Sequence, residues 1–332
     1  MPHFLEEKMI RAMTRLALAC FAAAICGAAT AQDFPKRAVT IVVPFAAGGG
    51  GDILARMAVQ RLEPKWGVPV VVENKPGAGG NIGAAAVARA APDGYTLLLA
   101  GSPQFAVNVT LFKTLPYDPI KDFAPLALAA ATPFVLVVNP NVPAKSVAEF
   151  VAYAKGQPQP LSYATAGFGV PHHLYMELLK SMTGLNMTPV PYRGSAPALS
   201  DVVAGHIPAM FVDLGPGLGQ MQGGGVRPLG GSMARKLEAL PDVPTINDTL
   251  PGFDVASWQM YAAPAGTPKE IVSKLNADLR SVLELPQMKE QVSKSGMLPL
   301  EAGSVEELQV FMKSEIARWG EVVRKAGIEG SQ

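Results

Sequence analysis

The chain has 332 residues, of which 49% are hydrophobic and 17% charged, and its formal net charge at pH 7 is +1. A chain of this length and composition can form two domains with buried cores and is too apolar for an intrinsically disordered protein. The near-neutral charge excludes a nucleic-acid partner held by phosphate contacts, because such surfaces need clusters of Lys and Arg.

Residues 1–31 have the pattern of a cleaved export signal. Lys8, Arg11 and Arg15 give a basic start, an apolar stretch follows, and Ala29–Ala31 reads Ala-Thr-Ala, which is typical of a cleavage site. The apolar stretch is shorter than the roughly 20 residues of a membrane-spanning helix. We therefore predict a signal peptide and a mature periplasmic chain that starts directly after it.

Both cysteines of the chain, Cys20 and Cys26, lie within the predicted signal peptide. Cleavage would leave a mature chain with no disulfide, no thiol nucleophile and no cysteine metal site, and with 25 acidic and 25 basic residues. A lipoprotein is the less favoured alternative, because the residues before either cysteine do not match a lipidation site.

After the signal, short apolar segments alternate with segments of helical periodicity. The first series predicts strands at 38–45, 68–74 and 95–101 and helices at 53–66 and 82–91. The second series predicts helices at 146–156, 171–184 and 195–206 and strands at 161–167, 187–192 and 207–215. Strands that alternate with helices indicate parallel sheets covered by helices on both faces, so we predict an α/β fold.

Two segments are predicted to cross between the two α/β units. Residues 124–138 are apolar but interrupted by two prolines, which favours a buried crossing strand over a membrane helix. The return crossing is expected at 251–268. Two crossings indicate a hinged clamshell, each lobe having a mainly parallel sheet flanked by helices. The predicted lobes are 32–133 plus 255–332 and 134–254.

The C-terminal part of the chain is predicted to be helical from its capping residues. Thr267 and Pro268 have the pattern of an N-cap and a first-turn proline before a helix at 271–284. Ser304 and Glu307 form a capping-box pattern that predicts a further helix directly after them. The apolar face of that last helix is expected to pack against the core.

The four glycines at 48–51 follow the first predicted strand, where a nucleotide-binding loop could lie. A dinucleotide-binding loop has the pattern Gly-x-Gly-x-x-Gly, and the candidate that starts at Gly77 and Gly79 has Ile82 at its sixth position. The first glycine run has Ile53 there, and no phosphate-binding lysine motif occurs anywhere. Nucleotide binding is therefore not expected.

Hydrolase and metal sites are also not supported. The chain has no Gly-x-Ser-x-Gly motif. Beyond the signal its histidines are His172, His173 and His206, and the two adjacent ones would point in different directions from a helix, which makes a poor metal pair. We predict no catalytic residues, no metal and no cofactor. The competing class is a secreted enzyme that uses His172 and Asp213 as acid and base.

A small-anion site agrees best with the expected architecture. Ligands of open parallel sheets bind beyond the carboxyl ends of the strands, where a helix N-terminus offers unpaired N–H groups and partial positive charge. A glycine-rich loop stands at such a junction in each unit, at 44–52 and at 164–173, and Ser102 and Gln104 follow a further strand end. Two facing loops could hold one carboxylate-bearing ligand between the lobes.

The order of several motifs resembles a known family. The matching segments are 34–62, 70–100, 115–130, 190–211, 240–253 and 263–279. Together they resemble, over residues 34–328, the Bug-type extracytoplasmic solute receptors of tripartite tricarboxylate transporters. The resemblance implies a two-lobed clamshell of the periplasmic-binding-protein type (type II-like) that captures its ligand without turnover.

The resemblance also implies partners and a site. The protein would capture a small organic acid or related carboxylate and deliver it to membrane permease subunits, and we expect it to be a monomer. The family loops that hold the ligand carboxylate, through backbone N–H groups and ordered water, match Ala46–Gly49 and Ala166–Gly169. The predicted ligand-binding residues are Phe45, Ala46, Ala47, Gly48, Gly49, Ser102, Gln104, Ala166, Gly167, Gly169, His172 and Asp213.

Two positions differ from the family pattern, so the ligand itself stays open. His172 stands where many members carry Ser or Thr, whereas His173 matches the usual histidine. Asp213 lies in a Phe-Val-Asp sequence where members often have Phe-Asp-Asn, and it could accept a hydrogen bond from a ligand amine or hydroxyl or have a structural role. Asp52 is expected to cap a helix. A sensor that presents its ligand to a membrane signalling partner is the further alternative.

Overall fold

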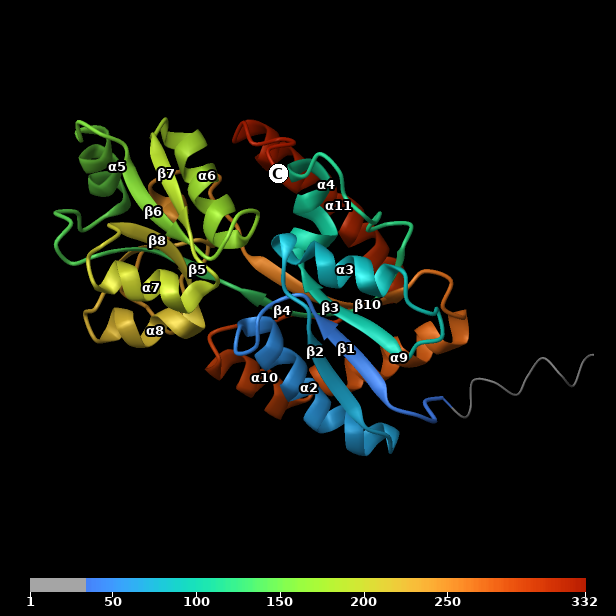
Figure 1. The fold of residues 1–332 in the computed structure, drawn as a ribbon. Coiled ribbons are helices and arrows are strands. Elements are labelled where there is room, and N and C mark those ends of the chain that lie inside the picture. The colour runs from blue at the N-terminus through green and yellow to red at the C-terminus, as the bar shows by residue number, and fades with distance from the viewer. Residues whose placement is uncertain (1–33) are drawn as a thin grey trace, which may run out of the picture.

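The computed structural model describes residues 34–332, which form two α/β lobes, each built on its own sheet (Figure 1). The predicted signal peptide lies outside the described residues. The first sheet has six strands in the order β11-β4-β10-β3-β1-β2, and the second has five in the order β7-β6-β8-β5-β9. Within residues 34–332, no helix is both long and apolar enough to span a membrane.

The strands are short except where the chain passes between the lobes. Those of the first sheet are β1 (Val39–Val43), β2 (Val70–Asn74), β3 (Thr96–Gly101), β4 (Phe123–Thr132), β10 (Ser257–Pro264) and β11 (Leu298–Pro299). Those of the second are β5 (Phe134–Val138), β6 (Leu161–Thr165), β7 (Met187–Pro191), β8 (Ala209–Asp213) and β9 (Arg227–Gly231).

Helices connect these strands and cover both sheets (Figure 1). Around the first sheet lie α2 (Gly50–Trp66), α3 (Asn81–Ala88), α4 (Asn108–Leu111), α9 (Lys269–Leu283), α10 (Pro286–Lys294) and α11 (Val305–Lys325). Around the second lie α5 (Val147–Lys155), α6 (Pro171–Thr183), α7 (Ser195–Val203) and α8 (Leu214–Gln222). Short helical turns are η1 (Ala78–Gly80), η2 (Pro103–Val107) and η3 (Ile246–Asp248).

Both sheets are mixed, which corrects the prediction of mainly parallel sheets. β1 pairs in parallel with β2 and β3, but β10 is antiparallel to β3 and β4. β6 is parallel to β7 and β8, but β5 is antiparallel to β8 and β9. β4 leads out of the first lobe and β10 leads back into it, so these two neighbouring strands run in opposite directions. The two-lobed α/β architecture itself is confirmed.

The two crossings between the lobes lie side by side. β4 leads into β5 through the single residue Pro133, and the chain returns between β9 and β10. Ser232, fully buried on the return path, accepts the Phe134 N–H at Oγ (3.1 Å) and donates from Oγ to the Val255 carbonyl (2.7 Å). These bonds tie the crossings together. The division of the chain into lobes at 133 and 254 stays a prediction.

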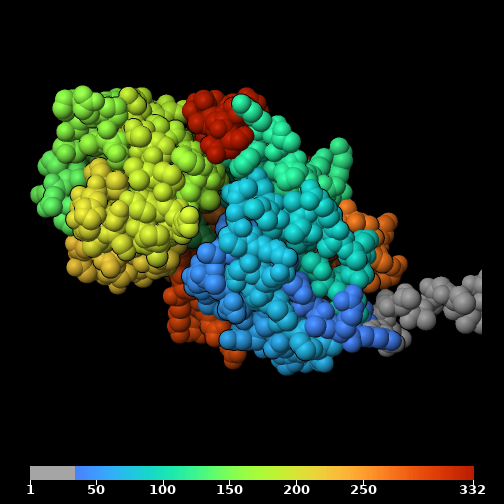
Figure 2. All heavy atoms as spheres, viewed as in Figure 1, coloured from blue at the N-terminus to red at the C-terminus, as the bar shows by residue number. Residues whose placement is uncertain are grey.

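The lobes also meet through the C-terminal helix. The rings of Tyr175 on α6 and Trp319 on α11 stack at 6.1 Å, and Ser181 Oγ donates to the Lys325 carbonyl at 2.6 Å. Figure 2 shows the C-terminal end of the chain at the boundary between the two lobes, which are in contact on the face in view. α11 therefore packs against both the first sheet and a helix of the second lobe.

The caps of the last helices match the prediction in one case and correct it in the other. Ser304 and Glu307 form the expected capping box at the start of α11. Thr267 is not the N-cap of α9, because that helix begins at Lys269 and Pro268 holds the cap position. The Thr267 hydroxyl instead donates to the Pro264 carbonyl (2.8 Å) and closes the turn after β10.

Candidate functional site

The first-lobe loop begins where β1 ends and leads directly into α2. The helix starts at Gly50, so two of the four glycines form its first turn. Gly48 has φ +82°, a left-handed conformation that residues with a side chain resist. Gly49 and Gly50 do not adopt a positive φ. The carbonyl of Phe45 is held by the Asn74 side chain at 3.1 Å. Glycine is thus required by the backbone at one position of the run.

The N–H groups of this loop are divided between internal bonds and the open helix end. The Gly49 N–H donates to the Ala46 carbonyl (3.3 Å), and the Gly48 N–H donates to Asp52 Oδ2 (2.9 Å). N–H groups in the first turn of a helix have no carbonyl partner within it. The N–H groups of Gly50 and Gly51 in the first turn of α2 are therefore further candidates for ligand contact beside the predicted loop residues, whose contacts stay a prediction.

Asp52 was expected to cap a helix, but the N-cap of α2 is Gly49, which has no side-chain cap hydrogen bond, and Asp52 instead accepts the Gly48 N–H just before the helix. It is buried, and its Oδ2 also accepts from Arg56 Nε at 3.0 Å. Burial raises the pKa of this carboxyl, but hydrogen bonds from Arg56 and the Gly48 N–H outweigh it, so the pKa lies below its ordinary value of 3.8. The carboxylate is committed to the loop and to Arg56 rather than to a ligand.

Two polar side chains of the crossing strands face Gly50, and sequence reasoning missed both. A Cβ on Gly50 would lie 3.8 Å from Thr132 Oγ1 and 3.8 Å from Gln259 Nε2. Thr132 and Gln259 are 8% and 6% exposed, and within residues 34–332 neither Thr132 Oγ1 nor Gln259 Oε1 has a hydrogen-bond partner. Polar residues inside apolar crossing strands are the sequence signal that could have revealed them.

Ser102 and Gln104 lie in the wall behind this site. Gln104 is fully buried, accepts the Gly101 N–H at Oε1 (3.1 Å) and donates from Nε2 to the Gly79 carbonyl (2.6 Å). Both halves of its amide are therefore used, one at the end of β3 and the other on the turn at 77–80. Ser102 is 1% exposed at the start of η2. These two residues shape the first lobe, and no bound ligand tests their predicted contact.

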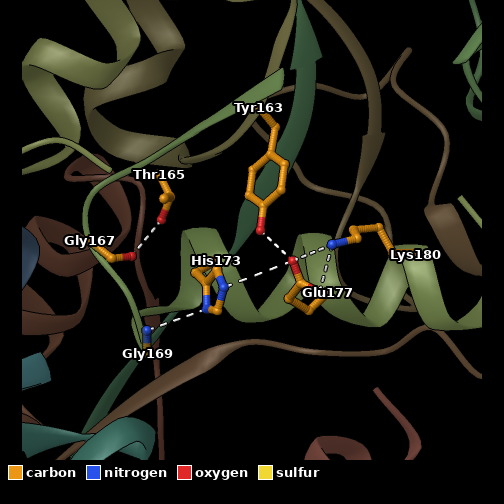
Figure 3. Close-up of polar contacts among 7 residues, drawn as sticks. All are labelled: Tyr163, Thr165, Gly167, Gly169, His173, Glu177 and Lys180. Atoms are coloured by element: carbon orange, nitrogen blue, oxygen red, sulfur yellow. Dashed lines mark hydrogen bonds and ion pairs between the residues drawn. The ribbon is translucent and has the colours of Figure 1, made fainter. Parts of the chain in front are cut away.

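The second-lobe loop follows β6 and contains Ala166, Gly167 and Gly169 (Figure 3). Gly169 has φ +73°, and a Cβ there would lie 3.0 Å from Leu111 of the first lobe. Thr165 Oγ1 donates to the Gly167 carbonyl at 2.7 Å, which fixes the loop to its own strand. The loop therefore stands at the boundary between the lobes, close to the end of α4.

His173 is hydrogen-bonded to this loop at Gly169 (Figure 3). Its Nδ1 accepts the Gly169 N–H at 3.4 Å, and its Nε2 lies 3.9 Å from Glu177 Oε1. Glu177 also accepts from Tyr163 (2.5 Å) and Lys180 (2.8 Å). Burial, together with the Lys180 charge, lowers the pKa of His173 below 6.5 despite Glu177. A neutral imidazole keeps the Nδ1 lone pair that this bond needs.

His172, Ser195 and Asp213 meet at the ends of three neighbouring strands. His172 is in the first turn of α6, Ser195 begins α7 and Asp213 ends β8. Asp213 Oδ1 lies 3.0 Å from His172 Nε2 and 2.6 Å from Ser195 Oγ, and Nε2 and Oγ are 3.2 Å apart. Burial raises the pKa of Asp213, but the bonds and charge of His172 and the Ser195 bond lower it overall.

This cluster does not have the geometry of a serine-hydrolase triad. In a triad the imidazole bridges the other two groups, with one ring nitrogen on the serine and the other on the carboxylate. Here one nitrogen of His172 approaches both groups, and its Nδ1 is buried without a hydrogen-bond partner among the described residues. The Ser195 hydroxyl donates its hydrogen bond to Asp213 and not to the imidazole, so it lacks the histidine base of a triad. Ser195 was not among the predicted site residues.

The two halves of the site lie on either side of the first crossing. Thr132 faces Gly50, and two residues later Phe134 stands opposite Asp213 in the pairing of β5 with β8. The Leu214 N–H donates to the Pro133 carbonyl at 3.1 Å. Two lobes joined by paired strands, with helix N-termini directed at the junction from both sides, define a clamshell binding protein.

No group of three or more residues suited to a metal occurs within residues 34–332.

Comparison with known proteins gives the family. Residues 54–328 match the model described as "Tripartite tricarboxylate transporter family receptor". The R. palustris protein Rpa4515, solved with adipate, aligns with a TM-score of 0.84 at 38% identity over 89% of this chain and 99% of that chain. The periplasmic binding protein BugD aligns with a TM-score of 0.82 at 36% identity over 89% of this chain and 99% of that chain. MatC of Rhodopseudomonas palustris with bound malate aligns with a TM-score of 0.80 at 35% identity over 87% of this chain and 100% of that chain.

The chain therefore belongs to the tripartite tricarboxylate transporter receptor family, in which the Bug proteins are found. Its function is that of a solute-binding receptor and not of an enzyme, which agrees with the disposition of His172, Ser195 and Asp213. The predicted resemblance is confirmed over most of the described chain.

Proposed function

We propose that this receptor binds a small carboxylate-bearing compound between its lobes in the periplasm and delivers it to a membrane permease of the tripartite tricarboxylate type. The observation that supports the proposal is the pair of glycine-rich loops at the N-termini of α2 and α6, one in each lobe. Both helix ends favour a carboxylate through partial positive charge, and the first turn of α2 adds free N–H groups. Two related receptors were solved with adipate and with malate.

In the proposed complex, one ligand carboxylate lies against the first turn of α2. Gly50 and Gly51 offer N–H groups there, and the unpartnered Thr132 hydroxyl stands beside Gly50. Phe45–Gly49 shape this side of the pocket, and Ala166–Gly169 close on the same carboxylate from the second lobe. Contacts from both lobes to one group would favour the closed state over the open one.

Transport is preferred over a sensing role because the matched family is defined by its transporter. A ligand-presenting sensor would use the same cleft and the same closure. Deletion of the gene separates the two roles: loss of uptake of the bound compound supports transport, and loss of a transcriptional response with intact uptake supports sensing. We further propose that the receptor acts as a monomer, which light scattering of the mature chain would test.

The carboxylate assignment is tested by thermal shift and calorimetry with a panel of organic acids, and by mass spectrometry of compounds that co-purify from the native periplasm. A ligand at 100 times its Kd stabilises a protein by about 2.7 kcal/mol, which for a chain of this size is a rise in Tm of about 4 °C. We expect such a rise with at least one monocarboxylate or dicarboxylate. If the panel gave neither a shift nor a heat of binding, the assignment would be wrong.

A further inference from the structure

The cluster of His172, Ser195 and Asp213 has free hydrogen-bond acceptors, whereas its donors are already used within the cluster. Asp213 Oδ1 accepts from both His172 Nε2 and Ser195 Oγ, so the Ser195 proton and the Nε2 proton are already used. The groups that remain are lone pairs, on Asp213 Oδ2, on Ser195 Oγ and, in a neutral imidazole, on His172 Nδ1. Nδ1 has no hydrogen-bond partner among residues 34–332, although the side chain is buried.

We propose that this cluster recognises a hydrogen-bond donor at the far end of the ligand, a hydroxyl, amide or ammonium group, in preference to a second carboxylate. The inference rests on the proposed carboxylate-binding function and narrows it. The preferred ligands are monocarboxylates that carry a hydroxyl, amide or amino group at a distance from the carboxylate. Asp213 is the residue that sets this preference, and His172 and Ser195 hold it in place.

The charge of the cluster acts in the same direction. An ionised Asp213 beside a neutral imidazole makes the cluster anionic, and protonation of His172 would only bring its charge to zero. In neither state is the cluster cationic, so it does not attract a second carboxylate. Burial of these groups weakens the solvent screening of like charges and strengthens this discrimination. A donor group would instead make a charge-assisted bond to Asp213.

The position of the cluster allows a ligand to reach it from the first-lobe loop. The side chains of His172 and Asp213 are 9% and 11% exposed, so the cluster is buried but not sealed. The ring of Phe134 meets the His172 ring edge-on, with centroids 5.0 Å apart, which fixes the imidazole. Phe134 is also the first residue of β5, directly after Pro133. Thr132, on the other side of Pro133, faces Gly50 in the first-lobe loop, so the cluster and that loop lie at the same crossing between the lobes.

The test compares ligands of equal length that differ only at the far end. Wild-type receptor is titrated by calorimetry with adipate, 6-hydroxyhexanoate and 6-aminohexanoate, and then with succinate, 4-hydroxybutanoate and 4-aminobutanoate. The same series is run on Asp213→Asn and on the control Asp201→Asn, which removes a partly exposed carboxylate bonded to Tyr192 in the same lobe. Circular dichroism and the ligand-free Tm establish that each variant is folded.

In wild-type receptor we expect the hydroxy or amino acid of at least one series to bind about tenfold or more tightly than the matching dicarboxylate. Asp213→Asn should weaken binding of the amino acid about 10- to 100-fold and improve binding of the dicarboxylate, while Asp201→Asn should leave the ratio unchanged. If Asp213→Asn does not fold, Ser195→Ala, which frees an acceptor site on Asp213, should keep the same preference for donors.

Two results would overturn the inference, and they have different meanings. Tighter wild-type binding of the dicarboxylates, or a ratio that Asp213→Asn leaves unchanged, would refute donor recognition and leave carboxylate binding intact. Absence of binding by all six compounds would refute the proposed carboxylate function, and the inference with it.

Discussion

The contact between the second-lobe loop and the first lobe can be tested by Gly169→Ala. Two effects add at this position: Gly169 has φ +73°, and a Cβ there would lie 3.0 Å from Leu111 Cδ2 and 3.5 Å from Phe112 Cε2. The left-handed conformation costs an alanine about 1–2 kcal/mol. The close approach adds an overpacking cost of about 1–3 kcal/mol. This cost destabilises the closed state, in which the two lobes are in contact. Because we propose that this arrangement holds the ligand, we expect Kd to rise about tenfold or more.

Gly184→Ala supplies a matched control for the backbone term. Gly184 has φ +68° at the C-terminus of α6, and a Cβ there would have no atom within 4 Å. Gly184→Ala should lose about 1–2 kcal/mol of unfolding free energy in urea and Gly169→Ala at least as much, but only Gly169→Ala should lose affinity for the carboxylate chosen from the thermal-shift panel. Equal Kd values for the two variants would refute the interpretation that close contact between loop 166–169 and the first lobe is needed for ligand binding.

Three further predictions concern single side chains. Thr132→Val keeps the shape of the residue and removes a hydroxyl that has no hydrogen-bond partner among residues 34–332, so calorimetry should show Kd raised about 3- to 10-fold with the ligand-free Tm unchanged or higher. An unchanged Kd would remove this residue from the site. Asp52→Asn should lower the unfolding free energy by about 1–3 kcal/mol at pH 7, because ionised Asp52 stabilises only the folded loop. The difference in unfolding free energy between wild type and variant should vanish as pH falls from 3.8 through the lower folded-state pKa of Asp52. The folded-state pKa of His173 is below 6.5, so wild-type stability should fall as pH decreases from 6.5 through that pKa, and His173→Asn, which keeps an acceptor for Gly169, should flatten the curve in chemical denaturation. An identical slope in that variant would contradict the role given to His173.

The order of elements was predictable because it depends on local pattern. Apolar segments such as 38–45 and 161–167 became β1 and β6, and the glycines at 48–51 stand where a strand gives way to a helix, as expected. The capping box at Ser304 and Glu307 formed as predicted, because its two hydrogen bonds join residues three apart. Signals of this kind require only neighbours along the chain.

Strand identity was less predictable where pairing partners decide it. Residues 251–268 were predicted as the return crossing between the lobes, with no strand assigned to them. In the structure Ser257–Pro264 form β10, buried throughout and paired with both β3 and β4. The directions of β5 and β10 also follow from the crossings between lobes, and no periodicity in the sequence records direction.

The α/β class, the two-lobed organisation and the helix starts at which an anion can bind followed from local patterns in the chain. Folding was needed to show which groups face the site, because it bonded the Gly48 N–H to Asp52, brought Thr132 and Gln259 to Gly50, and joined Ser195 to Asp213. Helix and strand patterns act over only a few residues. The hydrogen bonds that define this site join groups as many as 41 residues apart, and only folding sets such distances.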